Sequence, residues 1–397
     1  MTQIHSKEQN MKAVPVKDNI YWVGAIDWDL RNFHGYLTQR GSTYNAYLVM
    51  DETITLIDTV KHYLCDEMME RISSVVDPAK IGCVISNHVE MDHSGSLPNV
   101  AAIAPQAVIL TSQNGAKGLP AHFGTGLNIK AVTAGETFST GRYTFSFIPT
   151  PMVHWPDNML TYLTQERILF SNDAFGQHLA TAERFDDEYP LDIIMQEARK
   201  YYANIVLPYG EQAKKALAAA APLAIDVIAP SHGIIWRQHI PKILEAYQAW
   251  ASHKTMEKAV IVFDTMWGST QKIARAVARA FEHQGIRAMM MSLQTNHISD
   301  IMTEIIDAKY ICVGSPTLNN NMLPTVSAFL TYMRGLAPKD RIGLAFGSYG
   351  WGGQSVGQVE EVLRECGFTL LESIKIKYVP DEDALRAITE AVVKSLA

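Results

Sequence analysis

The chain has 397 residues, of which 47% are hydrophobic and 19% are charged, and its formal net charge is −7. This length exceeds what one hydrophobic core usually supports, so we expect two or more domains. The negative charge argues against a nucleic-acid partner held through phosphates. No apolar run approaches membrane-spanning length, and the polar segment 1–11 has no signal-peptide core, so no membrane association is expected.

The first long part of the sequence is rich in short β-type runs between turn signals. It predicts buried or half-buried strands with some helices between them, and so a mixed sheet system flanked by helices. The expected strands are Tyr21–Ile26, Ala46–Met50, Ile54–Ile57, Ile81–Ser86, Val108–Thr111, Tyr143–Ile148, Met159–Leu163, Ile168–Ser171 and Val227–Ala229, and the expected helices include His62–Val76 and Leu191–Ile205.

A regular alternation of strands and helices begins after the polar stretch His253–Glu257, so we place a domain boundary near residue 255. Such an alternation is typical of an open, doubly wound parallel sheet. The expected strands are Ala259–Phe263, Ala288–Ser292, Tyr310–Val313, Ile342–Phe346 and Thr369–Lys375, and the expected helices are Thr270–Gln284, Asp300–Ile306, Pro324–Arg334, Gly353–Cys366 and Asp383–Leu396.

The four cysteines lie far apart in the sequence: Cys65, Cys83, Cys312 and Cys366. Without a CxxC pair, the chain has no zinc ribbon, rubredoxin-type iron site or cysteine-ligated iron–sulfur cluster, because each needs clustered thiolates. We interpret all four as small buried apolar residues, and the scarcity of cysteine in a chain of this size indicates a cytoplasmic protein with reduced thiols.

Four candidate metal ligands follow the predicted strand Ile81–Ser86 within six residues: His88, Glu90, Asp92 and His93. In an extended loop, alternate residues face the same side, so the first three can converge while His93 faces a second point nearby. Imidazoles and carboxylates are ligands of divalent metals. A polar loop with satisfied histidines is the alternative, but four ligands in so short a stretch favour a metal site.

Three further candidates also follow predicted apolar strands, namely His154, Asp173 and His232. One histidine after a strand would be weak evidence of a metal site. Three candidates at strand ends fit a metal site built on the rim of a sheet sandwich.

The loop Asp264–Thr270 joins the strand Ala259–Phe263 to a helix and is rich in hydroxyls. Hydroxyls and free N–H groups at a helix N-terminus bind anions. The loop has neither a GxGxxG dinucleotide fingerprint nor a P-loop pattern, and it contains no lysine or arginine. These features fit the phosphate of flavin mononucleotide (FMN), although serine and threonine are also common helix caps.

Two later loops, Gly314–Asn321 and Gly347–Gly353, leave the same predicted sheet edge, where such sheets bind ligands. Trp351 or Tyr349 can stack on a flat ring, and the glycines let backbone approach it. The alternative is a set of ordinary turns with surface aromatics. The candidate flavin contacts are Thr265, Met266, Trp267, Gly268, Ser269, Thr270, Pro316, Thr317, Leu318, Asn319, Asn320, Ser348, Tyr349, Gly350, Trp351, Gly352 and Gly353.

The pattern HxExDH at residues 88–93, with the later His, Asp and His, resembles the metallo-β-lactamase-like domain of the flavodiiron proteins. The segment from about residue 256 resembles flavodoxin. The resemblance implies an α+β domain, 1–255, built as an αββα sandwich, and an α/β domain, 256–397, with a flavodoxin-like five-stranded parallel sheet. It also implies two non-haem irons and FMN as cofactors.

The resemblance further implies a ligand set. One iron takes His88, Glu90 and His154, the other takes Asp92, His93 and His232, and Asp173 bridges them. His34 matches a histidine near the open metal positions in the family, with a structural role as the alternative, and Tyr202 is a weaker candidate near the metals.

The function that the resemblance implies is reduction of dioxygen to water or of nitric oxide to nitrous oxide. Because no rubredoxin or flavin-reductase segment is fused to it, the chain is expected to be the minimal form and to take electrons from an external donor. Rubredoxin is the expected donor, with a deazaflavin donor as the alternative. The family pairs its subunits head to tail, so a homodimer, or a tetramer made of two such dimers, is expected.

Two other functions are compatible with parts of the sequence. One is a zinc hydrolase with a flavodoxin appendage, but hydrolases of this fold carry histidine where this chain has Glu90. Three carboxylates around two metals stabilise higher oxidation states, which redox chemistry needs and zinc hydrolysis does not. The other is an electron carrier with a structural metal. Two metal sites with room for substrate argue against it, because structural metal sites are usually closed.

Overall fold

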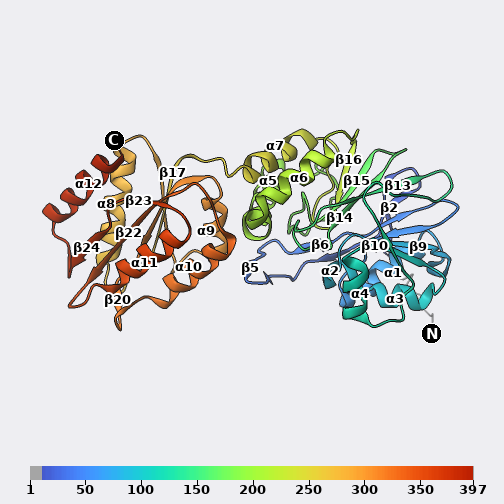
Figure 1. Cartoon of the computed structure of the whole chain (residues 1–397), viewed down its shortest axis with the longest axis horizontal. Coiled ribbons are helices and arrows are strands. Elements are labelled where there is room, and N and C mark those ends of the chain that lie inside the picture. The colour runs from blue at the N-terminus through green and yellow to red at the C-terminus, as the bar shows by residue number, and fades with distance from the viewer. Residues whose placement is uncertain (1–10, 397) are drawn as a thin grey trace, which may run out of the picture. The chain divides into compact units, whose positions relative to one another are not determined.

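The computed structural model describes residues 11–396, and the polar segment 1–10 lies outside the described residues. The chain folds into two compact units (Figure 1). The first contains the chain up to Phe33, Thr38–Tyr201 and Glu211–Tyr247, and the second contains His34–Leu37, Tyr202–Gly210 and the chain from Gln248 onward.

One sheet of the first unit has, within the described residues, seven strands in the order β1-β2-β7-β8-β9-β10-β11. The strands from β1 to β8 pair antiparallel and those from β8 to β11 pair parallel. Their bounds are Val14–Lys17, Ile20–Trp22, Tyr47–Val49, Thr55–Ile57, Cys83–Ser86, Val108–Ser112 and Ile129–Val132.

The predicted strand Tyr21–Ile26 is wrong as a single element, because the chain leaves β2 after Trp22 and continues as β3 (Ala25–Asp27), which pairs with β6 (Ser42–Tyr44). Gly24 lies at the break. A Cβ atom on Gly24 would lie 2.2 Å from the carbonyl oxygen of Tyr44, so close backbone approach requires glycine here.

The second sheet of this unit has the order β12-β13-β14-β15-β16. A core containing Trp22, Ile85, Phe145 and Phe170 fills the space between the two sheets. The strands are Thr137–Ser139, Thr144–Pro149, Met159–Leu163, Ile168–Asn172 and Val227–Pro230.

Helices cover both outer faces of this pair of sheets. Met68, Leu97 and Leu119, from α1, α3 and α4, pack against the outer face of the first sheet. Helices α6 and α7 pack on the second sheet near β14 (Figure 1). The predicted αββα sandwich is therefore confirmed, and its helices are α1 (Cys65–Ser73), α3 (Leu97–Ile103), α4 (Gly115–Phe123), α5 (Leu191–Tyr201), α6 (Gly210–Ala220) and α7 (Ile240–Ala251).

The second unit contains a wholly parallel sheet with the order β18-β17-β19-β22-β23, and β24 also pairs with β22. The predicted strand Thr369–Lys375 is divided into β23 and β24, which pair with successive parts of β22. The strands are β17 (Met256–Phe263), β18 (Arg287–Ser292), β19 (Ala308–Gly314), β22 (Ile342–Tyr349), β23 (Thr369–Leu370) and β24 (Ile374–Lys377).

The helices of the second unit connect these strands, and α8 packs beside α12 (Figure 1). A small hairpin of β20 (Thr317–Leu318) and β21 (Asn321–Met322) extends the loop after β19. The strand order is that of a flavodoxin-like doubly wound sheet, as predicted. The helices are α8 (Ser269–His283), α9 (Ile298–Ile305), α10 (Pro324–Leu336), α11 (Gln354–Glu365) and α12 (Glu382–Leu396).

Candidate metal and flavin sites

The candidate metal ligands lie in four loops that follow β9, β13, β15 and β16. The loop after β9 is not extended throughout, contrary to the prediction. Glu90 precedes a short helix, α2 (Met91–Ser94), which carries Asp92 and His93. On this helical turn Asp92 faces His232, with 3.3 Å between Oδ2 of Asp92 and Nε2 of His232, while the His93 ring lies 5.5 Å from the His88 ring.

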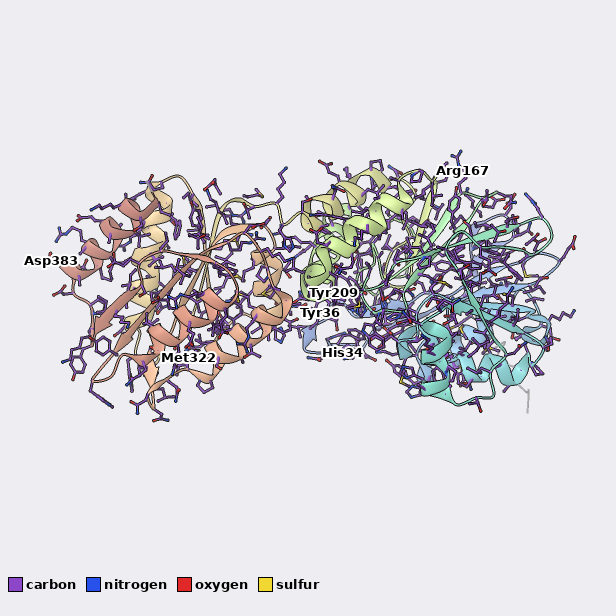
Figure 2. All side chains as sticks on the ribbon, in the orientation of Figure 1. His34, Tyr36, Arg167, Tyr209, Met322 and Asp383 are labelled. Atoms are coloured by element: carbon purple, nitrogen blue, oxygen red, sulfur yellow. The ribbon has the colours of Figure 1, made fainter. Side chains whose placement is uncertain are left out.

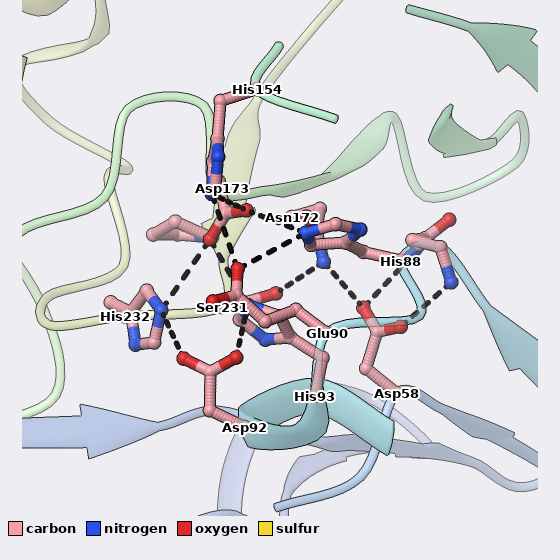
Figure 3. Close-up of polar contacts among 12 residues, drawn as sticks. Asp58, His88, Glu90, Asp92, His93, His154, Asn172, Asp173, Ser231 and His232 are labelled. Carbon is pink, nitrogen blue, oxygen red and sulfur yellow. Dashed lines mark hydrogen bonds and ion pairs between the residues drawn. The ribbon is translucent and has the colours of Figure 1, made fainter. Parts of the chain in front are cut away.

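The seven predicted ligands form two adjacent groups (Figure 3). In each group the potential ligand atoms lie within 4.8 Å of one another. One group contains His88, Glu90, His154 and Asp173, and the other contains Asp92, His93 and His232.

Asp173 faces both groups. Its Oδ2 atom lies 3.3 Å from Nε2 of His154, and its Oδ1 atom lies 3.1 Å from Nε2 of His93 and 3.4 Å from Nε2 of His232. A carboxylate with one oxygen toward each group can bridge two metal ions.

Several buried ligand atoms form no hydrogen bond within the described residues: Nε2 of His88, both carboxylate oxygens of Asp92, both ring nitrogens of His93 and Oδ2 of Asp173. Buried polar atoms are normally hydrogen-bonded, and leaving one unpaired costs roughly 1–3 kcal/mol. Since these atoms converge and are the usual donors to divalent metals, the residues present fit a pair of bound metal ions.

Neighbouring polar groups hold the ligand rings in place. Asp157 Oδ2 lies 2.8 Å from Nδ1 of His88, and the carbonyl oxygen of Thr43 lies 2.8 Å from Nδ1 of His232. These contacts leave Nε2 of each ring directed toward the site. Such partners fix the tautomer and orientation of a ligand histidine.

The floor of the site contains a buried amide and carboxylate network. The Asp58 carboxylate accepts hydrogen bonds from the backbone and side chain of Asn87, at 2.7 and 3.0 Å (Figure 3). The Asn172 amide also donates to the hydroxyl of Ser231. The network joins three of the four loops, so it fixes the strand ends from which the ligands project.

The protein alone already favours a charged site. Burial opposes a charged Asp173, but the neighbouring His93, His154 and His232 outweigh it and hold the pKa of that carboxyl well below its usual range. Burial also opposes a charged His88, yet the hydrogen bond to Asp157 and the nearby carboxylates of Glu90 and Asp173 raise its pKa. Metal ions would replace the protons on such histidines.

Tyr201 is a neighbour of the metal site that the sequence analysis did not identify. Its hydroxyl donates a 2.9 Å hydrogen bond to Oδ1 of Asp173. The adjacent candidate, Tyr202, packs its ring against Trp250 within the second unit. A tyrosine pair at the end of α5 gave no sequence signal to distinguish the two.

His34 lies in the exposed turn between β4 (Asn32–Phe33) and β5 (Tyr36–Leu37), with a positive φ of 52° (Figure 2). It belongs to the second unit, so a role beside the metals stays a prediction.

A pocket of about 620 Å³ lies at the carboxyl edge of the second unit's sheet. This volume suits a flavin-sized ligand. Trp267 and Trp351 stand at its wall with 94% and 90% of their surface exposed. The predicted contacts that line it are Thr265, Met266, Trp267, Ser269, Pro316, Thr317, Asn319, Asn320, Ser348, Tyr349, Gly350, Trp351 and Gly352.

Four predicted contacts do not line this pocket: Gly268, Thr270, Leu318 and Gly353. Thr270 is fully buried, and its hydroxyl lies 3.0 Å from the hydroxyl of Ser348. It therefore supports the pocket wall through Ser348, and its contact with a ligand phosphate stays a prediction.

Tyr378 and Val379 complete the pocket wall, and no sequence pattern indicated them. They follow β24, which pairs with the carboxyl half of β22 and so brings them beside Tyr349. Only this pairing could have identified them.

Comparison with known proteins identifies the family of each domain. Residues 43–233 match the family described as ODP family beta lactamase, and residues 261–391 match Flavodoxin. The chain is 42% identical to the nitric oxide reductase of Moorella thermoacetica, over 96% of this chain and 97% of that protein. It is 41% identical to the rubredoxin-oxygen oxidoreductase of Megalodesulfovibrio gigas, over 97% and 98% of the two chains.

The crystal structure of the flavodiiron protein from Giardia intestinalis superposes with a TM-score of 0.95, at 33% identity and over 98% of this chain and 97% of that one. This chain belongs to the flavodiiron proteins. The flavodoxin-like unit of a flavodiiron protein implies FMN, and its β-lactamase-like unit implies iron. No helix within residues 11–396 is both long and apolar enough to span a membrane.

Proposed function

We propose that this flavodiiron protein reduces dioxygen to water, nitric oxide to nitrous oxide, or both, at a pair of non-haem irons, with electrons passed through FMN. The observation that carries the proposal is Glu90. It stands where zinc hydrolases of this fold have histidine, and its carboxylate lies within the first ligand group, 3.4 Å from Nε2 of His88. With Asp92 and Asp173 it supplies three carboxylates, the donor set that favours redox-active metals.

The ligand assignment is part of the proposal. His88, Glu90 and His154 would hold one iron, Asp92, His93 and His232 would hold the other, and Asp173 would be shared between them. When bound, the irons and FMN supply the electron-transfer chemistry. The protein fixes the ligand rings through Asp157 and Thr43, and Tyr201 holds one oxygen of the bridging carboxylate.

The domains proposed are residues 1–255 for the metals and 256–397 for FMN. The pocket-lining residues given above hold the flavin, and His34 and Tyr202 are the proposed neighbours of the metals. A cytoplasmic location is inferred from the sparse, unpaired cysteines, which are free in the structure.

The external donor proposed is a rubredoxin, with a reduced deazaflavin as the alternative. The name of the relative from Megalodesulfovibrio gigas supports the first. Steady-state turnover with each gas, using one reduced rubredoxin and then one reduced deazaflavin, distinguishes the donors and ranks the two substrates.

Metal analysis separates the proposal from its main rival. Two irons per chain, with turnover of either gas, support gas reduction. Two zincs per chain in the fully active protein, or failure to reduce either gas when iron and FMN are both bound, would exclude it.

We also propose a head-to-tail homodimer, in which FMN of one subunit serves the metals of its partner. The support is the family resemblance, since a two-fold pair uses each contact twice. A complementation test mixes two inactive variants under conditions of subunit exchange. One has lost iron through His88→Asn, and the other has lost FMN through changes in Thr265–Thr270.

The mixed dimer contains one complete path between FMN and iron only if the path crosses between subunits. Recovered turnover supports the dimer. Proven subunit exchange without recovery contradicts it.

A further inference from the structure

Helix α5 continues into a π-helical turn, Tyr202–Val206, which begins directly after Tyr201. π-helical turns are rare in proteins and occur frequently at functional sites. The chain also passes from the first compact unit to the second between Tyr201 and Tyr202. Two consecutive residues of one continuous helical run therefore belong to different units, and the backbone of this turn links their positions.

Tyr201 is held against the metal ligands by the first unit. Its side chain is 1% exposed, its hydroxyl donates the 2.9 Å hydrogen bond to Oδ1 of Asp173, and its ring centre lies 5.9 Å from that of His232. Hydrogen bonds weaken steeply when they are lengthened or bent. A small displacement of the backbone at Tyr201 is therefore enough to weaken its bond to Asp173.

Asn204 holds the π-helical turn within the second unit. Its amide nitrogen donates a 3.1 Å hydrogen bond to the carbonyl oxygen of Ser299 in α9, and its amide oxygen accepts a 2.8 Å hydrogen bond from the hydroxyl of Tyr332 in α10. The Asn204 side chain is buried, and both ends of its amide are used. Buried polar networks whose members are satisfied specify one arrangement of the elements that they join.

Asn204 and Tyr201 are three residues apart in this helical run. Each peptide unit between them is planar, so the backbone has few ways to absorb a shift at one end without moving the other. Because π-helical turns are rare, contacts outside the helix are needed to keep one in place. Loss of the contacts of Asn204 should therefore let the turn relax and move Tyr201.

We propose that Asn204 and Tyr332 are positioning residues of the metal site, which act through the π-helical turn to hold the Tyr201 hydroxyl on Asp173. The proposal rests on the proposed function, because Asp173 is assigned there as the carboxylate shared by the two irons. A hydrogen bond to a ligand carboxylate makes it a weaker electron donor, so such partners help to set the reduction potential of the metal.

Two substitutions remove the contacts of Asn204, namely Asn204→Ala and the milder Tyr332→Phe, which keeps the ring. Tyr162→Phe is the matched control, because it removes a 2.6 Å hydrogen bond from a tyrosine hydroxyl to the carbonyl oxygen of Ala224, at the end of β16 opposite to His232. Hydrogen exchange of the full-length protein should be several-fold faster at amides 202–206 in both test variants and unchanged there in the control.

The second readout is the reduction potential of the irons in the holoenzyme. Both test variants should lower it, as Tyr201→Phe does but by less, because the hydrogen bond to Asp173 is displaced and not deleted. In a Tyr201→Phe background, Tyr332→Phe should cause no further shift, since residues that act through one another are not additive. Iron and FMN contents should equal those of the unaltered protein, and Tyr162→Phe should leave the potential unchanged.

An unchanged potential in a variant whose amides 202–206 exchange faster overturns the proposal, because the turn then serves only the packing of the second unit. Unchanged exchange in both test variants also overturns it. A shift of full size in the Tyr201→Phe background excludes Tyr201 as the link. The proposed function fails separately, through lack of turnover of either gas in the unaltered protein, and the exchange result does not depend on that outcome.

Discussion

Removal of the Asp157 carboxylate should weaken metal binding at the site while the FMN domain stays intact. Asp157 is 4% exposed, and its Oδ2 atom lies 2.8 Å from Nδ1 of His88 and 2.7 Å from the backbone nitrogen of Val89. Burial opposes its charge, but the contact with His88 outweighs burial and lowers the pKa of Asp157, so it is charged at neutral pH.

The size of the effect follows from these contacts. A hydrogen bond to a charged group contributes about 1.5–3 kcal/mol, and each 1.4 kcal/mol is about tenfold in a binding constant. Asp157→Ala should therefore weaken iron binding about ten- to a hundredfold, in the range typical of partners of metal-ligand histidines. Loss of the acceptor also leaves the His88 ring free to rotate or change tautomer.

Chelator competition against the reconstituted protein measures this affinity, and flavin absorbance measures FMN content. The control is Asp226→Ala, which breaks the surface ion pair between Asp226 and Arg167; Arg167 is labelled in Figure 2. Exposed ion pairs contribute only about 0–1 kcal/mol to folding stability, so the variant should stay folded and its iron affinity should not change. Iron affinity in Asp157→Ala equal to that of the control would refute the role assigned to Asp157.

Three further substitutions test separate parts of the molecule. Glu90→His should abolish iron binding and gas reduction but retain FMN, because the two sites lie in different domains; a variant with both irons and full activity would contradict this. Thr270→Val removes the 3.0 Å contact with Ser348 and should weaken FMN binding by about 0.5–1.5 kcal/mol, with iron content unchanged. Unaltered flavin affinity in equilibrium titration would show that this contact does not support the pocket. Tyr201→Phe removes the hydrogen bond to the charged Asp173, which leaves a more electron-donating carboxylate, so the iron reduction potential should fall by up to roughly 65–130 mV. Spectroelectrochemical titration measures this potential, and an unchanged value argues against the role of Tyr201.

The sequence by itself determined the chemistry of this protein to a large extent. The metal ligands stand at the ends of apolar strands, and four of them fall within residues 88–93. The flavin loops likewise follow strands with clear apolar patterns. Local sequence patterns predict such features well, because strand periodicity and the spacing of ligand residues both depend on neighbouring positions in the sequence.

Residue alternation along the loop did not divide the ligands between two sites as the structure does, although the family resemblance implied the observed division. The sequence predicted an extended loop in which His88, Glu90 and Asp92 converge, whereas α2 turns Asp92 toward His232. Four residues are too few for a helical period to be recognised, and the ends of elements are the least predictable parts of a pattern.

The partners that orient the ligands and complete the flavin pocket were also decided by tertiary structure. Asp157, Thr43 and Tyr201 reach the site from separate elements, and Tyr378 reaches the pocket because β24 pairs with β22. Sheet register and packing between distant segments bring these residues together. A local sequence pattern predicts the backbone conformation of one segment, but it does not predict which distant segment will pack beside it.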